Sequence, residues 1–213
     1  MTGPTQIRPA QIRPVQIRLA TEADLPEIAE IHLKGWLLAY GAFMPADQLE
    51  AMQPERRLPL WRDWLSDPQK LILVCSLGER LDGFVLGGPV KDHDITDGGS
   101  LAGFDCEIYS LHCRAETQGK GLGRALITAA AAHWAKEGRQ ALILWAYADN
   151  AYRKFYERIG GELIAQGVDE GIPDVAYGWR DLARLIKGNT PSPLPSPARG
   201  EGGSESGKNT TLA

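Results

Sequence analysis

Residues 116–126, ETQGKGLGRAL, place three glycines within five residues, directly before a sequence that favours a helix. A glycine inside a helix costs about 1 kcal/mol relative to alanine, so Gly119, Gly121 and Gly123 delay a helix predicted over 124–136. A helix N-terminus presents unpaired N–H groups and the positive end of the helix dipole, both of which attract anions. The segment therefore predicts either an anion site with exposed backbone or a tight turn with close strand-to-helix packing.

Two common phosphate-binding loops differ from this segment in spacing. A P-loop has GxxxxGK followed by Ser or Thr, whereas here Lys120 precedes Gly121 and no hydroxyl residue follows. A dinucleotide-binding turn has GxGxxG after the first strand, and an acidic residue about 20 positions later. Here the turn follows several predicted strands, and its third glycine is misplaced. The spacing thus disfavours a nucleotide-binding enzyme.

The apolar pattern on both sides of the glycine turn predicts a mixed α/β domain. Helices are predicted over 21–41, with Thr21 as the N-cap, and over 54–65, 124–136 and 150–160. Strands are predicted over 15–19, 70–77, 81–90, 104–113, 140–147, 161–168 and 175–182. The short loop at 78–80 predicts a hairpin between the second and third strands.

The two ends of the chain have compositions that do not suit a core. Residues 6–20 repeat QIRPA, QIRPV and QIRLA, and Pro9 and Pro14 exclude the first two copies from a central strand. From residue 188 onward, half of the residues are Gly, Pro or Ser. We therefore predict a flexible leader over 1–14, a folded domain over 15–187 and a disordered tail over 188–213.

Charge and cysteine content exclude several classes of protein. The net charge of −4 argues against a broad nucleic-acid surface. Apolar runs of signal-peptide or membrane length are absent from the sequence, and the three cysteines lack CxxC spacing, which together predict a reducing, cytoplasmic location without membrane binding. The histidines have no metal-ligand spacing, so no metal is predicted, and they are interpreted as incidental imidazoles: His32, His93, His112 and His133.

Several separate segments together resemble the GNAT superfamily of acetyl-CoA-dependent N-acetyltransferases. QGKGLG matches the signature Q/R-x-x-G-x-G/A through Gln118, Gly121 and Gly123. CEIYSLHCR resembles the central strand of the family, which is splayed by a bulge, and DNAYRKFYERIGGELI resembles its Asn-containing helix. QIRLATEADLPEI and DVAYGWRDL resemble the opening strand and helix and the closing strand. The resemblance covers about 16–183 and implies a mixed, mostly antiparallel sheet, splayed at its middle strand and flanked by helices.

The resemblance implies acetyl-CoA as co-substrate and direct transfer of its acetyl group to a primary amine in a ternary complex. The residues implied to hold the pyrophosphate are Gln118, Gly119, Lys120, Gly121, Leu122, Gly123 and Arg124. Backbone groups of Leu111, His112 and Cys113 would hold the pantetheine arm and polarise the thioester carbonyl. Asn150 and Arg153 complete the cofactor-binding set. Asn150 lies six positions before Tyr156, where many relatives have seven, and Tyr152 replaces a small residue.

Tyr156 is the predicted acid and Glu107 the predicted base. A phenol with a pKa of about 10 stays protonated at neutral pH and can protonate a departing thiolate. By residue type alone Tyr156 would be a core partner of Phe155. Glu107 precedes Leu111 by four residues and shares its strand face unless a bulge intervenes, and a solvated carboxylate is the alternative. Cys113 as an acyl carrier would need a neighbouring base that the sequence does not identify.

The loop KDHDITDGGSLAGFDCE predicts a positively charged acceptor. Its acidic residues, opposed only by Lys91, are Asp92, Asp94, Asp97, Asp105 and Glu107. Acidic mouths concentrate cations, so a small cationic amine such as a polyamine or aminoglycoside-like compound is expected, and a surface loop without a role is the alternative. A protein N-terminus or lysine side chain also remains open as acceptor, and the resemblance suggests a homodimer. The competing function is a non-catalytic acyl-CoA-binding or regulatory module, which the presence of Tyr156 and Glu107 disfavours.

Overall fold

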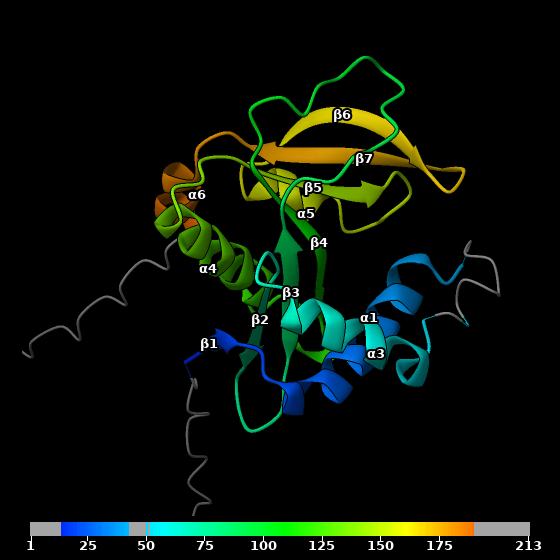
Figure 1. Ribbon diagram of the computed structural model, residues 1–213, viewed down its shortest axis with the longest axis vertical. Helices are drawn as coiled ribbons and strands as arrows, with labels where there is room; N and C mark the ends of the chain where they lie inside the picture. The colour runs from blue at the N-terminus through cyan, green and yellow to red at the C-terminus, as the bar shows by residue number, and fades with distance from the viewer. Residues whose placement is uncertain (1–13, 43–49, 51, 190–213) are drawn as a thin grey trace, which may run out of the picture.

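The computed structural model describes residues 14–42, 50 and 52–189. Within these residues the chain forms a seven-stranded sheet of order β1-β2-β3-β4-β5-β7-β6 (Figure 1). The strands are β1 Gln16–Leu19, β2 Leu71–Ser76, β3 Gly83–Gly88, β4 Cys106–Cys113, β5 Leu142–Tyr147, β6 Glu162–Asp169 and β7 Ile172–Trp179. All neighbouring pairs are antiparallel except β4 and β5, which are parallel. The predicted mixed, mostly antiparallel sheet is confirmed.

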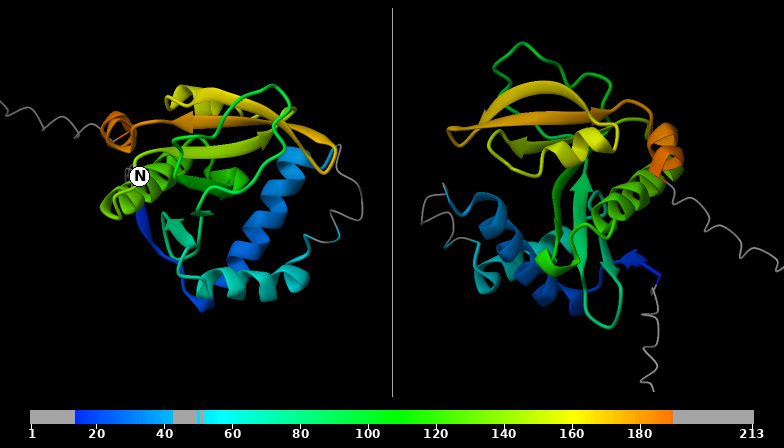
Figure 2. Two further views of the ribbon diagram at one scale, coloured as in Figure 1. Left: turned by 45° about the horizontal axis from the view of Figure 1, so that its top comes forward. Right: turned by 180° about the vertical axis from the view of Figure 1, so that it is seen from behind.

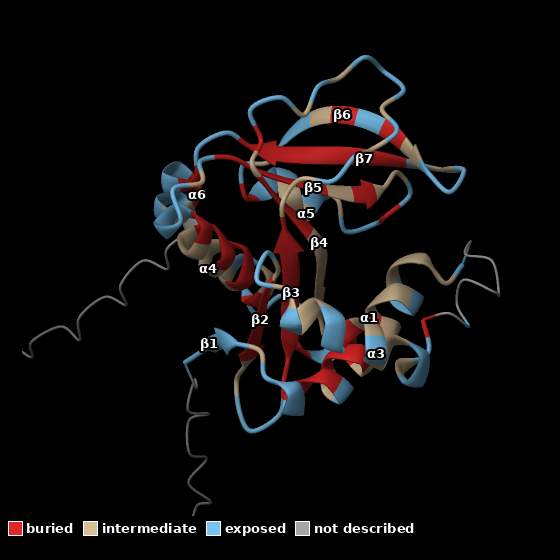
Figure 3. Cartoon of the chain, viewed as in Figure 1, coloured by how far each residue is buried: buried red, intermediate tan, exposed pale blue. Residues whose placement is uncertain are grey.

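Helices cover both faces of this sheet. The helices α1 Leu25–Tyr40 and α3 Pro54–Ser66 pack on one face, and α4 Leu122–Lys136 and α6 Leu182–Asn189 pack on the other (Figure 1). Alternate residues of β2 serve the two layers, since Leu71 and Leu73 face α4 while Ile72 and Val74 face α1 and α3. Figure 3 shows the result, with β3 and most of β7 buried and most of α6 exposed.

The middle of the sheet opens at β4. Pairing with β5 covers only Cys106–Ile108, whereas pairing with β3 continues to Cys113. Gly87 is opposite Ile108 and Leu86 is opposite Ser110, so Tyr109 is an extra residue that bulges from the ladder. Beyond the bulge β4 pairs with β3 alone, which confirms the predicted splay and leaves backbone open on the side toward β5.

The glycine turn serves two different needs. Gly119 and Gly121 have φ of +75° and +82°, the left-handed region that other residues rarely adopt, and Gly121 is the N-cap of α4. Gly123 lies inside the first turn, where an added Cβ would approach the Phe155 ring to 3.3 Å. The helix begins at Leu122, two residues before the predicted start. The positive φ angles of Gly119 and Gly121 fit the predicted tight turn, and an anion site at their open backbone stays a prediction.

The helix α1 is held at both of its ends. Thr21 precedes a short 3-10 turn, η1 Glu22–Asp24, and donates its N–H and hydroxyl to the Asp24 carboxylate. Arg18 donates two further bonds of 2.7 Å and, with Thr21, lowers the pKa of Asp24 to about 2. Toward the other end, Gly35 lies so close to His112 that no side chain would fit between them. This contact sets the end of α1 against β4.

The structure and the sequence prediction differ after β5. The helix predicted over 150–160 is reduced to α5 Lys154–Arg158, preceded by turns. The helix α6 was not predicted. It continues to Asn189, past the predicted domain boundary at 187.

Both ends of the chain lie largely outside the described residues. Residues 1–13 of the predicted leader and 190–213 of the predicted tail are not part of the described ranges. Within those ranges, none of the helices has the length and apolar character needed to cross a membrane.

Candidate active site

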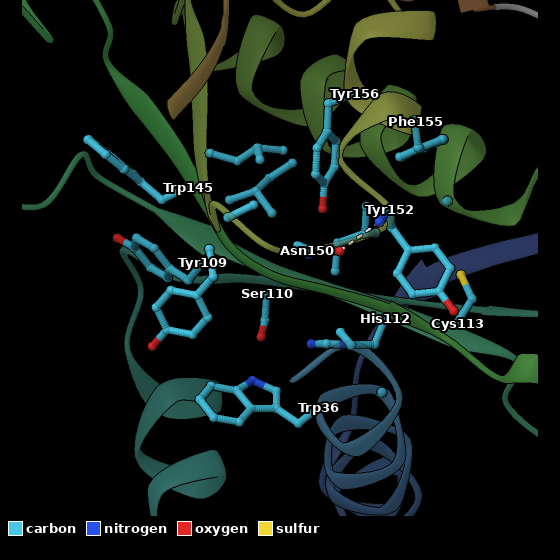
Figure 4. Close-up of a pocket in the computed structure, with 18 of the residues that line it drawn as sticks. Trp36, Tyr109, Ser110, His112, Cys113, Trp145, Asn150, Tyr152, Phe155 and Tyr156 are labelled. Carbon is cyan, nitrogen blue, oxygen red and sulfur yellow. Dashed lines mark hydrogen bonds between the residues drawn. The ribbon is translucent and has the colours of Figure 1, made fainter. Parts of the chain in front are cut away.

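A cavity of about 950 Å³ lies where β4 and β5 separate (Figure 4). It is lined by α1, β4, the glycine turn, β5, α5, the loop between β3 and β4, and the β6–β7 hairpin. Most of the predicted site residues line it: Glu107, Leu111, His112, Cys113, Gln118, Gly119, Gly121, Leu122, Gly123, Arg124, Asn150 and Tyr156. The fold therefore brings together residues that the sequence distributes over two motifs and a strand.

Two predicted residues lie outside the lining. Lys120 is exposed on the glycine turn. Arg153 lies beside Tyr177, where its positive charge opposes the rise in the pKa of that hydroxyl. A cation that sequence reasoning missed, Arg158 of α5, lines the cavity instead.

One end of the cavity is suited to an anion. An added Cβ at Gly119 or Gly121 would meet no atom within 4 Å, so the backbone there is open to a ligand. The first N–H groups of α4 have no helical partner and point from the positive end of its dipole. Arg124 and Arg158 line this end and form no ion pair with any residue that the structure describes. These features fit the pyrophosphate of a coenzyme A molecule.

Tyr156 presents its hydroxyl to the same cavity. Its ring packs against Phe155 at 5.3 Å and Tyr177 at 5.6 Å between ring centroids. Figure 4 shows the hydroxyl directed into the cavity, and no side chain or backbone group of the described chain forms a hydrogen bond with it. Burial, followed by the proximity of Tyr40, raises the pKa of Tyr156. The phenol is thus both a packing residue and a protonated donor without a partner.

Asn150 connects the start of the α5 segment to α1. Its side-chain N–H donates to the Tyr40 hydroxyl at 2.9 Å, and its side-chain carbonyl accepts the N–H of Tyr152 at 2.8 Å. Asn150 is buried, whereas Tyr152 is 41% exposed at the rim of the cavity. Contact between Asn150 and a pantetheine arm remains a prediction, since its polar groups already have partners within the protein.

Glu107 lies in a buried position that its spacing did not predict. The bulge at Tyr109 breaks the alternation, so Glu107 does not share the face of Leu111, which packs toward α4 with Cys106 and Ile108. The Glu107 carboxylate accepts the N–H of Lys91 at 2.8 Å. It also lies 3.0 and 3.1 Å from His93 Nε2. The exception that the prediction allowed for applies here, because the bulge adds one residue and puts Glu107 and Leu111 on opposite faces.

His93, interpreted from the sequence as incidental, lines the cavity. Its ring stacks on Trp145 of β5 at 4.6 Å with an interplanar angle of 24°. The loop that carries it lies over β6 and β7 (Figure 2) and is fixed there by hydrogen bonds from Thr96 to Gln166 and from Val168 to Asp94. The sequence offers no sign of this arrangement, because His93 and Glu107 are 14 residues apart and the pair depends on how the loop folds.

The predicted acidic mouth is only partly present in the lining of the cavity near His93. Of the five predicted acids, Asp92 and Glu107 line the cavity. Asp105 instead accepts the backbone N–H groups of Gln140 and Ala141. The β6–β7 hairpin supplies two acids that the prediction omitted, Asp169 and Asp174. Burial, then the charge of Asp169, raises the pKa of Asp174 to about 6.

The remaining predicted side chains on β4 have structural surroundings. His112 packs against His32 and Phe84, and burial lowers its pKa to about 4, so it is neutral near pH 7. The Cys113 thiol lies against Cys75 and raises the pKa of that thiol. No residue in the described ranges acts as a base on Cys113, which disfavours an acyl-carrier role. Within those ranges, no group of three or more His, Cys, Asp or Glu side chains is placed to hold a metal.

Comparisons with known proteins agree with this geometry. The Acetyltransferase (GNAT) family matches residues 36–161. The uncharacterized N-acetyltransferase YuaI of Bacillus subtilis (strain 168) is 26% identical over 173 residues, covering 79% of this chain and 94% of the relative.

Two solved structures with coenzyme A or acetyl-CoA bound share the fold. The PaiA N-acetyltransferase from Thermoplasma acidophilum in complex with coenzyme A has a TM-score of 0.60 and 19% identity, covering 78% of this chain and 99% of that one. YncA from Salmonella typhimurium with its cofactor acetyl-CoA has a TM-score of 0.56 and 22% identity, covering 78% and 94%.

Proposed function

This chain belongs to the GNAT family of acetyltransferases and is an acetyl-CoA-dependent acyltransferase, and we propose that it acetylates a primary amine by direct attack in a ternary complex. The observation that supports this most strongly is that one cavity contains both an open helix N-terminus, with two arginines that form no ion pair within the described ranges, and the Tyr156 hydroxyl, which forms no hydrogen bond with any described residue. An anionic co-substrate bound there would lie beside a proton donor. Acetyl-CoA, when bound, supplies the activated acetyl group.

The residues at the glycine-turn end of the cavity would have different roles in holding the co-substrate. The glycine turn, Arg124 and Arg158 would bind the pyrophosphate, because backbone N–H groups and guanidinium groups both favour phosphate oxygens. The backbone of residues 111–113, unpaired toward β5, would hold the pantetheine arm and polarise the carbonyl. Tyr156 would donate its proton to the sulfur that leaves.

The opposite end of the cavity is suited to a cation. Asp92, Asp169 and Asp174 line it from two segments. The rings of Trp36, Tyr40 and Tyr147 pack together in the lining, and Tyr147 donates to Asp169 at 3.0 Å. Aromatic faces and carboxylates both attract ammonium groups. We therefore propose a small cationic amine, such as a polyamine or an aminoglycoside-like compound, as the acceptor.

Binding and turnover can test this proposal separately. Isothermal titration should show binding of coenzyme A and none of ATP. Acetyl-CoA should then yield N-acetylated product, measured by mass spectrometry, with spermidine or kanamycin in preference to phenethylamine, glutamate or a peptide with a free N-terminus. Coenzyme A binding without turnover on any amine would instead support the acyl-CoA-binding module. Preference for the peptide would refute the small-amine assignment.

A further inference from the structure

The contact between His93 and Glu107 determines which nitrogen of the imidazole carries hydrogen. A carboxylate can only accept hydrogen bonds, so the Nε2 atom that faces both Glu107 oxygens must carry hydrogen. In the neutral ring the lone pair is therefore on Nδ1. No group in the described part of the chain bonds to Nδ1, and Nδ1 is not among the buried unsatisfied atoms. The stack on Trp145 holds the plane of the ring.

The two members of the pair differ in their access to the cavity. The Glu107 side chain is 4% exposed, and its oxygens already face His93 and the N–H of Lys91. The His93 side chain is 18% exposed. An acceptor amine that enters the cavity therefore meets the imidazole more readily than the enclosed carboxylate.

We infer that His93 takes the proton from the acceptor amine and that Glu107 is a positioning residue, an inference that rests on the proposed acetyl transfer. Nδ1 of His93 accepts a proton from the ammonium group and frees the nitrogen lone pair. That nitrogen bonds to the carbonyl carbon of the thioester as the carbon–sulfur bond breaks. Tyr156 gives its proton to the sulfur and regains one from the new amide nitrogen, while His93 releases its proton to solvent. This division resembles other pairs in which a buried carboxylate orients an imidazole that moves protons.

Several other titratable and charged groups face the region around His93. Those that face this region are Glu107 from β4, Asp174 from β7, Asp169 from β6, and Lys91 and Asp92 from its own loop. His93 lies near enough to Asp174 to oppose the rise in the pKa of that acid. A pH profile must therefore distinguish His93 from Asp174 as well as from Glu107.

The pH dependence of kcat/KM and kcat, measured with spermidine or the best amine of the panel, makes this distinction. The wild-type rate should fall on the acidic side as one group is protonated. His93→Gln should lower kcat by about 10²- to 10⁴-fold, the usual range for a general base, and should abolish the acidic fall. Glu107→Gln should lower kcat less and move the fall to lower pH, because the neutral amide stabilises an imidazolium less. Asp174→Asn should keep the fall.

Other results would overturn the inference. If Glu107→Gln abolishes the acidic fall while His93→Gln retains it, Glu107 itself is the base. If the fall disappears only in Asp174→Asn, neither member of the pair is responsible. His133→Gln provides a matched control, since His133 pairs with Glu137 at 3.2 Å on α4 outside the cavity, and its profile should match wild type.

A nuclear magnetic resonance measurement tests the pair without any acceptor. The ¹⁵N signals that disappear in His93→Gln identify His93, and they should show the Nε2–H tautomer in the wild-type protein. The Nδ1–H tautomer would overturn the inference. Failure of the wild type to acetylate any amine would refute the proposed function and the role together, whereas normal kcat in His93→Gln would refute the role alone.

Discussion

The two ends of the cavity are built in opposite ways. The end that would hold the co-substrate comes largely from one short stretch, the glycine turn and the first residues of α4, with Arg158 added from α5. The end proposed for the acceptor draws single side chains from separate segments, among them His93, Glu107, Trp145 and Asp174. The first end is cationic and uses mainly backbone. The second end is acidic and uses mainly side chains, so substitutions there should affect the chemistry more than the affinity for acetyl-CoA.

Tyr156→Phe should have the largest effect and tests where the two ends meet. The change keeps the ring and removes the donor, so kcat should fall by about 10²- to 10⁴-fold, with little change in the Kd of acetyl-CoA. Tyr177→Phe is the control, because it removes a hydroxyl from the neighbouring ring, which bonds to Glu157 outside the cavity. Equal kcat values for both variants would reduce Tyr156 to a packing residue.

Gly121→Ile tests the backbone end. The isoleucine side chain would enter the open space in front of α4, and the residue would be strained at φ +82°. The Kd of acetyl-CoA should rise about tenfold or more, equivalent to about 1.4 kcal/mol. Gly138→Ile imposes a similar strain, at φ +84°, beyond the opposite end of the same helix. If both variants bind acetyl-CoA equally well, the glycine turn does not bind the pyrophosphate.

Ionic strength tests the acidic end, with a smaller expected effect. The value of kcat/KM for a cationic amine should fall several-fold from low to high salt, because salt screens attraction to the acids that line the cavity. A neutral acceptor analogue should change little. If both acceptors respond alike, Asp92, Asp169 and Asp174 do not steer the substrate.

His112 provides the mildest test, on the strand between the two ends. Its pKa is about 4 in the folded protein, below the ordinary value of 6.5, so the unfolded chain binds more protons between these values. The free energy of unfolding should therefore decrease as the pH falls from 6.5 toward 4, by about 1–3 kcal/mol. Urea unfolding of His112→Asn should show a smaller decrease, with the Kd of acetyl-CoA unchanged. A higher Kd would mean that the His112 side chain, and not only its backbone, contributes to acetyl-CoA binding.

The fold could be predicted largely because its signals are local. Alternation in β2 and the glycines before α4 each specify a conformation within a few residues. The late start of α5, which was predicted at residue 150, has a local cause too. The Asn150 side-chain carbonyl accepts the N–H of Tyr152 and forms a turn before the helix begins. The helix α6 was missed because it is short and is stabilised by contacts of Leu182 and Leu185 with distant residues.

Only those parts of the site that come from contiguous sequence segments could be predicted. Gly121, Gly123 and Tyr156 belong to contiguous motifs and line the cavity. His93 and Asp174 also line the cavity but belong to no shared motif, because their proximity depends on a loop that folds across β6 and β7. A single extra residue at Tyr109 also reversed the expected face of Glu107. Side chains that converge from separate elements have no spacing in the sequence by which to recognise them.

The central claim is that this cavity holds both substrates at once. Initial velocities with acetyl-CoA and the amine both varied test it most directly. We predict double-reciprocal lines that intersect, with the same pattern in Cys113→Ala, because the acetyl group passes directly from one substrate to the other. Parallel lines, together with loss of activity in Cys113→Ala, would show transfer through an acetylated enzyme and contradict the account.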